Sequence, residues 1–165
     1  MILQVRKVLR ALVWPGTATL VFPLATVFVG REASRTLTRS SLNVDQSVVD
    51  SLTFAHIWPG EATVNREKVG LIEQAIVVRV GVLHAESTSD PTRELATAGY
   101  RVAATNLPGL LHVEHVVRAA IGQMGPDNGV RIQFHSSRNQ AIRSQGKGTT
   151  RDLIFRAWCT SAPDY

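Results

Sequence analysis

The longest uncharged apolar pattern in the chain, residues 11–30, lies near its N-terminus. A helix of about 20 residues spans about 30 Å, the thickness of a bilayer core. Basic residues stand before the run, at Arg6, Lys7 and Arg10, and others follow it, so the charge balance assigns no topology. The run predicts an apolar helix, or two half-helices broken near Pro23, that anchors the protein in a membrane.

The same N-terminal residues admit other interpretations. A basic start followed by an apolar core is typical of a cleaved secretory signal, but bulky Phe28 or charged Arg31 stands where a small residue is required. Residues 1–43 are rich in Arg, Ser and Thr and contain one acid, as a mitochondrial presequence does. Residues 17–29 are β-branched enough for a buried strand pair. We favour a single-pass membrane protein, with a mitochondrial or a secreted protein as the alternatives.

The segment after the apolar run predicts a linker and then the start of a domain. Residues 31–47 are polar and hydroxyl-rich, as linkers are, and the domain is expected over residues 48–165. Val48 to Trp58 predicts a short strand or helix, ended by a turn at Pro59-Gly60. The apolar spacing from Val64 to Ile76 predicts a helix.

A strand–helix–strand pattern occupies the middle of the chain. Ile76 to Leu83 is dense in β-branched residues and predicts a buried strand. Asp90 can cap a helix over residues 92–98, and Tyr100 to Ala104 predicts a second strand. Such crossovers favour parallel neighbours, so the two strands are expected side by side with the helix crossing between them.

The last third of the chain predicts one helix and two strands. Apolar residues recur every third or fourth position from Leu110 to Met124, which indicates a helix, with Glu114 and Arg118 placed to form an ion pair. Val130 to His135 alternates as a half-buried strand does, and Leu153 to Trp158 predicts a closing strand. The fold class expected is α/β, a small mixed or parallel sheet with two or three helices after an N-terminal apolar helix. The alternative is α+β.

Positive charge is concentrated towards the C-terminus. Six basic residues and one acid lie between Asn128 and Arg156, giving +5, the formal net charge of the whole chain. Much of this charge falls in a predicted polar loop, Ser136 to Arg151. A basic cluster attracts nucleic-acid phosphate, acidic lipid head groups or an acidic protein face, or is simply a solvated surface. Anion or nucleic-acid binding is predicted for Arg131, Arg138, Arg143, Lys147 and Arg151.

Histidines supply the weak candidates for a metal site. His112 and His115 stand three apart on the predicted helix, and Glu114 lies between them. The zinc-protease pattern His-Glu-x-x-His needs a spacing of four with the glutamate after the first histidine, so the match fails. We therefore expect no metal and no other cofactor.

A polar loop after the predicted central strand supplies the weak catalytic candidates, His84, Glu86 and Asp90. Ligands of open α/β sheets bind beyond the carboxyl ends of parallel strands, which is where this loop is expected. Helix capping explains most of the same residues. No Gly-x-Ser-x-Gly motif is present to supply a serine nucleophile.

Function is expected to be non-enzymatic. Cys159 is the one cysteine, so no internal disulfide forms and no disulfide-linked partner is expected. The leading hypothesis is a membrane-associated accessory or interaction protein, tethered through residues 11–30, that presents a basic domain to an anionic partner. The alternative is a soluble or organelle-imported protein that binds nucleic acid through residues 131–156. A small hydrolase is the third hypothesis.

Overall fold

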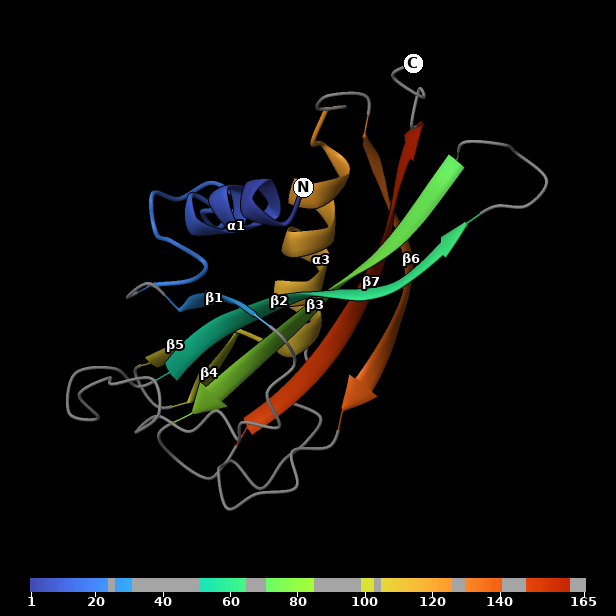
Figure 1. Cartoon of the computed structure of the whole chain (residues 1–165). Helices are drawn as coiled ribbons and strands as arrows, with labels where there is room; N and C mark the ends of the chain where they lie inside the picture. The colour runs from blue at the N-terminus through green and yellow to red at the C-terminus, as the bar shows by residue number, and fades with distance from the viewer. Residues whose placement is uncertain are drawn as a thin grey trace.

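The computed structural model describes eight stretches of the chain, shown in colour in Figure 1: residues 1–23, 26–30, 51–64, 71–84, 99–102, 105–125, 130–140 and 148–160. Their helices and strands, in chain order, are α1 (Ile2–Arg10), β1 (Val27–Val29), β2 (Ser51–Val64), β3 (Leu71–His84), β4 (Tyr100–Val102), β5 (Thr105–Leu107), α3 (Leu110–Gly122), β6 (Arg131–Gln140) and β7 (Gly148–Thr160). The fold is mixed α/β, as predicted. The helix predicted over Leu110 to Met124 is confirmed as α3.

The main sheet has five strands in the order β1-β2-β3-β7-β6. β1 pairs with β2 in parallel, and all other neighbours are antiparallel. The predicted parallel pairing of Ile76–Leu83 with Tyr100–Ala104 is wrong, because β3 lies between β2 and β7 while β4 pairs with β5 in a separate hairpin. The crossing helix predicted over residues 92–98 lies outside the described residues.

The long hairpin of β2 and β3 replaces the helix predicted from Val64 to Ile76, which is wrong for the described part of that range. Leu71 to Ile76 is strand, paired with β7 along its length. The predicted turn at Pro59-Gly60 is also wrong, because β2 continues past it to Val64 with a register shift between Pro59 and Ala62. A bulge accommodates a proline, which has no N–H for the ladder. Gln74 Nε2 donates to the Gly60 carbonyl at 2.8 Å beside this shift.

The uncharged run is not helical in its described residues, so the helix predicted over residues 11–30 is wrong. Helix α1 ends at Arg10, before the run. Pro15 and Gly16 then form a tight turn, closed by the Thr17 N–H donating to the Trp14 carbonyl at 3.0 Å, with Gly16 at φ 74°. Proline followed by a left-handed glycine is the preferred sequence of such a turn. The turn reverses the direction of the chain, so Val13 and Leu20 lie side by side and form an antiparallel β-bridge.

The rest of the run joins the sheet and its core. Thr26 Oγ1 donates to the Thr53 carbonyl at 2.7 Å, and Thr53 Oγ1 donates to the Val21 carbonyl, so two side-chain bonds tie the run to β2. Val21 and Val27 are fully buried in the same hydrophobic core as the central strands. No helix among the described residues is long and apolar enough to cross a membrane.

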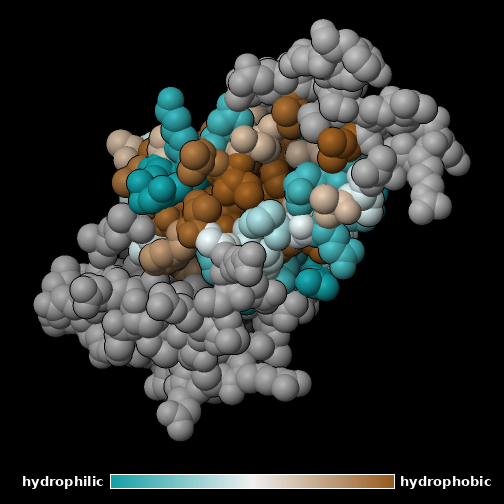
Figure 2. Space-filling view, in the orientation of Figure 1, coloured by the Kyte–Doolittle hydropathy of each residue, from teal (hydrophilic) through white to brown (hydrophobic). Residues whose placement is uncertain are grey.

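The helices α1 and α3 cover the same face of the sheet. α3 packs across β3, β7 and β6, and α1 packs against β1, β2 and α3. Figure 2 shows apolar side chains gathered in the middle of the visible face, over the region where α1, α3 and the central strands lie in Figure 1. The helix-side core includes Val5, Leu9, Val78, Val80, Val113, Val117, Leu153 and Phe155.

The face turned away from the helices is also closely packed. Phe54, Trp58 and Val77 alternate with core residues along β2 and β3, so they lie on this second face, and all three are buried. A Cβ added at Gly81 would stand 2.2 Å from Phe54 Cζ, so the phenyl ring occupies the space of a missing side chain. We call this second side the outer face.

Candidate functional sites on two faces of one strand

Strand β7 places two consecutive charged residues on opposite faces of the sheet. Arg151 has the same parity as the core residues Leu153 and Phe155, so it points to the helix side. Asp152 has the opposite parity and lies on the outer face, because successive side chains of a strand alternate. Each of the two residues belongs to a different cluster of charged groups.

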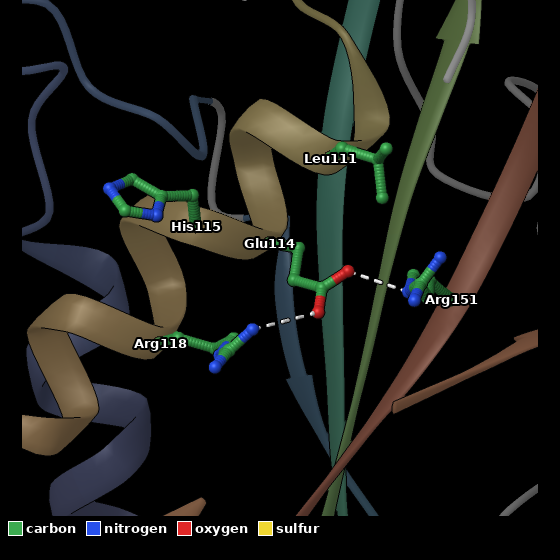
Figure 3. A pocket seen from close by; sticks show the side chains of 5 residues that line it. All are labelled: Leu111, Glu114, His115, Arg118 and Arg151. Carbon is green, nitrogen blue, oxygen red and sulfur yellow. Dashed lines mark ion pairs between the residues drawn. The ribbon is translucent and has the colours of Figure 1, made fainter. Parts of the chain in front are cut away.

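The helix-side cluster is centred on the buried carboxylate of Glu114. Arg151 Nε lies 2.6 Å from Glu114 Oε2, and Arg118 Nη1 lies 3.5 Å from Oε1. Figure 3 shows the carboxylate between these two guanidinium groups. Arg151 is held further by Ser137, whose Oγ accepts from Arg151 Nη2 at 2.9 Å. The predicted pairing of Glu114 with Arg118, one turn apart on α3, is confirmed.

An open cleft of about 490 Å³ lies against this cluster, lined by Leu111, Glu114, His115, Arg118 and Arg151. Arg118 is fixed from a second side, because its Cζ lies 3.8 Å from the centroid of the Phe134 ring on β6. Face-on contact of a guanidinium with an aromatic ring is attractive and restricts the side chain. The cleft therefore presents a positioned arginine beside a carboxylate.

The outer cluster is centred on Asp152, which is fully buried. Arg79 donates to both carboxylate oxygens, from Nε at 2.7 Å and from Nη2 at 3.1 Å. Arg138 Nε lies 3.7 Å from Oδ2 on the other side. Arg79, Asp152 and Arg138 are register partners on β3, β7 and β6, so the ion pairs run straight across three strands. Arg79 also lies 5.1 Å from the ring centroid of Trp58.

Another ion pair lies on the outer face, further along β7. Arg156 Nη1 lies 2.6 Å from Glu73 Oε1, and Trp158 Nε1 donates to Glu73 Oε2 at 3.2 Å. Arg156 Nη2 also lies 3.0 Å from His135 Nε2 on β6. Glu73 therefore fixes an arginine of the neighbouring strand, as Asp152 does.

In the ion pairs of Arg138 and Arg156 the carboxylate is less exposed than the arginine, whereas the side chain of Arg79 is only 18% exposed. The side chains of Asp152 and Glu73 are 1% and 18% exposed, whereas those of Arg138 and Arg156 are 61% and 41% exposed. Arg131 is also exposed and faces the same side, opposite Trp158. We name Arg131, Arg138 and Arg156 the outer arginine row.

The basic residues that the sequence grouped together are divided by the sheet. Arg131 and Arg138 lie on the outer face, but Arg151 faces the helices. The polar loop predicted over Ser136 to Arg151 is wrong at both ends, because β6 extends to Gln140 and β7 begins at Gly148. Two of the predicted binding residues, Arg143 and Lys147, lie outside the described residues. Arg156 and Arg118 are not among the residues predicted to bind an anion. The alternation of side chains along β7 is the sequence signal for Arg156, and the position four residues after Glu114 on α3 is the signal for Arg118.

The two candidate metal-binding histidines have different surroundings on α3. The His112 ring packs on Trp14, with centroids 4.8 Å apart. His115 lines the cleft, and in Figure 3 its ring points away from the Glu114 carboxylate. Within the described ranges, no three His, Cys, Asp or Glu side chains gather at distances suited to a metal ion.

The catalytic candidates are not tested by the described residues. His84 is the last residue of β3, opposite Ser51 of β2, and its side chain is not described. Glu86 and Asp90 lie outside the described residues. The hydrolase hypothesis therefore stays a prediction.

No protein-family model matches the sequence, and no curated protein matches it significantly. The geometry of the two clusters therefore carries the functional inference.

Proposed function

We propose that this chain is a non-enzymatic interaction protein that docks the phosphate backbone of a nucleic acid on its outer arginine row. One observation carries the proposal: on the outer face the carboxylates of Asp152 and Glu73 are less exposed than Arg138 and Arg156, which pair with them. A partner approaching this face meets positive charge first, because Arg79 and the three arginines of the row outnumber the two carboxylates paired with them.

Arginine chemistry supports a phosphate partner. A guanidinium has five N–H donors in a planar fork that matches phosphate oxygens, and the ion pairs with Asp152 and Glu73 use only some of them. Because those carboxylates already restrain Arg138 and Arg156, less side-chain entropy is lost when a ligand binds.

The length of the row supports a polymer as the partner. Arg131 and Arg138 stand at the two ends of the exposed part of β6. At about 3.3 Å per residue, their Cα atoms are separated by roughly 20 Å along the strand. One small ion reaches only one of these side chains, whereas a nucleic-acid backbone carries charges at regular intervals and reaches both.

Binding is expected to be moderate in affinity and strongly dependent on salt. Each phosphate contact releases condensed counterions, so three contacts predict a slope of about −2 to −3 in a plot of log affinity against log salt concentration. Base-specific discrimination is not expected, because contacts to phosphate position a nucleic acid without reading its sequence.

Filter binding of the full chain to single-stranded RNA and duplex DNA at roughly 50 mM salt, where such contacts are strongest, tests the proposal. Replacing Arg131 and Arg138 by glutamine should weaken binding and flatten the salt slope by about one unit for each lost contact. The matched control replaces Lys7 and Arg10, which are exposed on α1, and removes the same charge. No affinity for either nucleic acid, or equal losses in the two variants, would refute the proposal.

A membrane surface is the second candidate partner, and the N-terminal region favours it. Leu3 is 69% exposed on α1, close in sequence to Lys7 and Arg10, and Val13 and Leu20 are exposed too. Apolar side chains next to cations are typical of contact with acidic lipid head groups. Sedimentation with acidic vesicles reverses the roles of the two variants: loss of Lys7 and Arg10 should abolish vesicle binding, and loss of Arg131 and Arg138 should not.

A further inference from the structure

We infer that the cleft between α3 and β7 binds a small organic anion, a carboxylate or a phosphate monoester with a short apolar part. This site is separate from the outer arginine row, because the sheet lies between them. Its residues are Leu111, Glu114, His115, Arg118 and Arg151.

The charge of the cleft favours an anion. Two guanidinium groups, those of Arg118 and Arg151, face the single carboxylate of Glu114, so the three together carry one positive charge in excess. The carboxylate is almost completely buried, and charges that are partly shielded from water interact more strongly than charges in bulk solvent. A bound anion balances the remaining charge.

Arg118 is the side chain best placed to hold the anion. It is 45% exposed, so a ligand in the cleft reaches it, while Glu114 and the Phe134 ring fix its position. Glu114 lies near one terminal nitrogen, at 3.5 Å, which leaves other N–H donors of the fork for a ligand oxygen. An arginine restrained in this way binds a carboxylate or phosphate with little further loss of entropy.

The size and lining of the cleft indicate a ligand with an apolar part. A volume of about 490 Å³ lies within the range of roughly 300–1,000 Å³ that is usual for small-molecule sites. An inorganic ion leaves most of this space to water. Leu111 supplies an apolar wall, against which the apolar part of the ligand can pack.

Titration of the isotope-labelled full chain, followed by NMR of backbone and arginine Nε–H signals, tests the inference with four probes: acetate, benzoate, inorganic phosphate and phenyl phosphate. Saturable shifts are expected at Arg118 and its neighbours on α3, with the aromatic probes binding more tightly than acetate or phosphate. A preference for benzoate or for phenyl phosphate identifies the head group as carboxylate or phosphate.

Two variants separate this site from non-specific attraction. Arg118→Gln should weaken binding by about tenfold, the factor that 1.4 kcal/mol represents, and Arg118→Lys should restore only part of it because lysine lacks the planar fork. The matched control Lys7→Gln removes the same charge from the exposed side of α1, away from the residues that line the cleft, and should leave binding unchanged. Thermal unfolding confirms that each variant is folded.

Two results would overturn the inference. One is the absence of saturable shifts for all four probes at about 10 mM, a concentration that detects even millimolar dissociation constants. The other is an equal loss of binding in Lys7→Gln and Arg118→Gln. Neither result bears on nucleic-acid docking at the outer arginine row, whose test uses a different ligand and replaces arginines of the outer face.

Discussion

Arg151 and Asp152 are neighbours in sequence, yet they belong to charge clusters with different physical properties. In each cluster one carboxylate lies near two arginines, Arg118 and Arg151 around Glu114, and Arg79 and Arg138 around Asp152. The Asp152 pair with Arg79 has two short hydrogen bonds inside a packed sheet face. Glu114 lies beside a cleft that is open to solvent. We therefore expect Asp152 to act mainly in folding, whereas Arg118 of the helix-side cluster is exposed to the cleft and accessible to a ligand.

Asp152→Asn should break the outer cluster and give the largest loss in the free energy of unfolding. The substitution keeps the shape of the side chain but removes the carboxylate charge that pairs with the largely enclosed guanidinium of Arg79. Breaking a buried ion pair from one side reduces the free energy of unfolding by about 3–5 kcal/mol. Urea denaturation measures the change, with the exposed Glu61→Gln as the control for charge loss. A loss below about 1 kcal/mol, typical of a surface pair, would contradict the structural role of Asp152.

Glu114→Gln, in the helix-side cluster, should reduce the free energy of unfolding by less than Asp152→Asn does. Arg118 is half exposed and Arg151 is partly so, which lets water solvate both cations after the carboxylate is gone. An exposed ion pair contributes at most about 1 kcal/mol and breaking a buried one costs about 3–5 kcal/mol, so for these partly exposed pairs the free energy of unfolding should fall by about 1–3 kcal/mol. The same denaturation experiment ranks the two clusters. If Glu114→Gln destabilises the protein as much as Asp152→Asn, the difference in burial has no energetic consequence.

Gly81→Ala tests whether the outer face is as tightly packed as the Phe54 position indicates. The new methyl group would stand 2.2 Å from Phe54 Cζ and 2.9 Å from Thr150 Cγ2, so the phenyl ring has to move. Overpacking of this kind reduces the free energy of unfolding by about 1–3 kcal/mol. Ala introduced at Gly122, where nothing lies within 4 Å of the added Cβ, is the matched control. An unchanged midpoint for Gly81→Ala would mean that the ring is loosely held.

Local patterns predicted the elements that local forces determine. On α3, the apolar face and the Glu114–Arg118 ion pair follow from spacings of three and four residues. On β6, the alternation of apolar and polar side chains follows from a spacing of two. The apolar spacing of Leu71 to Ile76 also fits one face of a helix, but this segment pairs with β7 and is therefore a strand. Tertiary contacts of this kind override local propensity.

The candidate sites were harder to predict, because they depend on pairs of residues far apart in the sequence. Arg79 and Asp152 are 73 positions apart, and Glu73 and Trp158 are 85 apart. A charge count over residues 128–156 finds the excess of arginine. It cannot find the carboxylates of Glu73 and Glu114 that hold two of these side chains in place. The division of the basic residues between two faces became visible only with the register of β6 and β7.

Arg138→Gln should have the smallest effect on stability and a measurable effect on binding, which separates the two roles of the outer face. Its guanidinium is mostly exposed and 3.7 Å from Asp152, and exposed pairs contribute at most about 1 kcal/mol to stability. Arg79 remains to balance Asp152, so the denaturation midpoint should hardly change. The salt slope of RNA binding should nevertheless flatten by about 0.7 units, the loss of one phosphate contact to a single strand. Arg118→Gln, on the helix side, should leave that slope unchanged. If Arg138→Gln destabilises the fold strongly and leaves the slope as it was, Arg138 acts in folding together with Asp152 and Arg79, and the outer arginine row is not a docking surface.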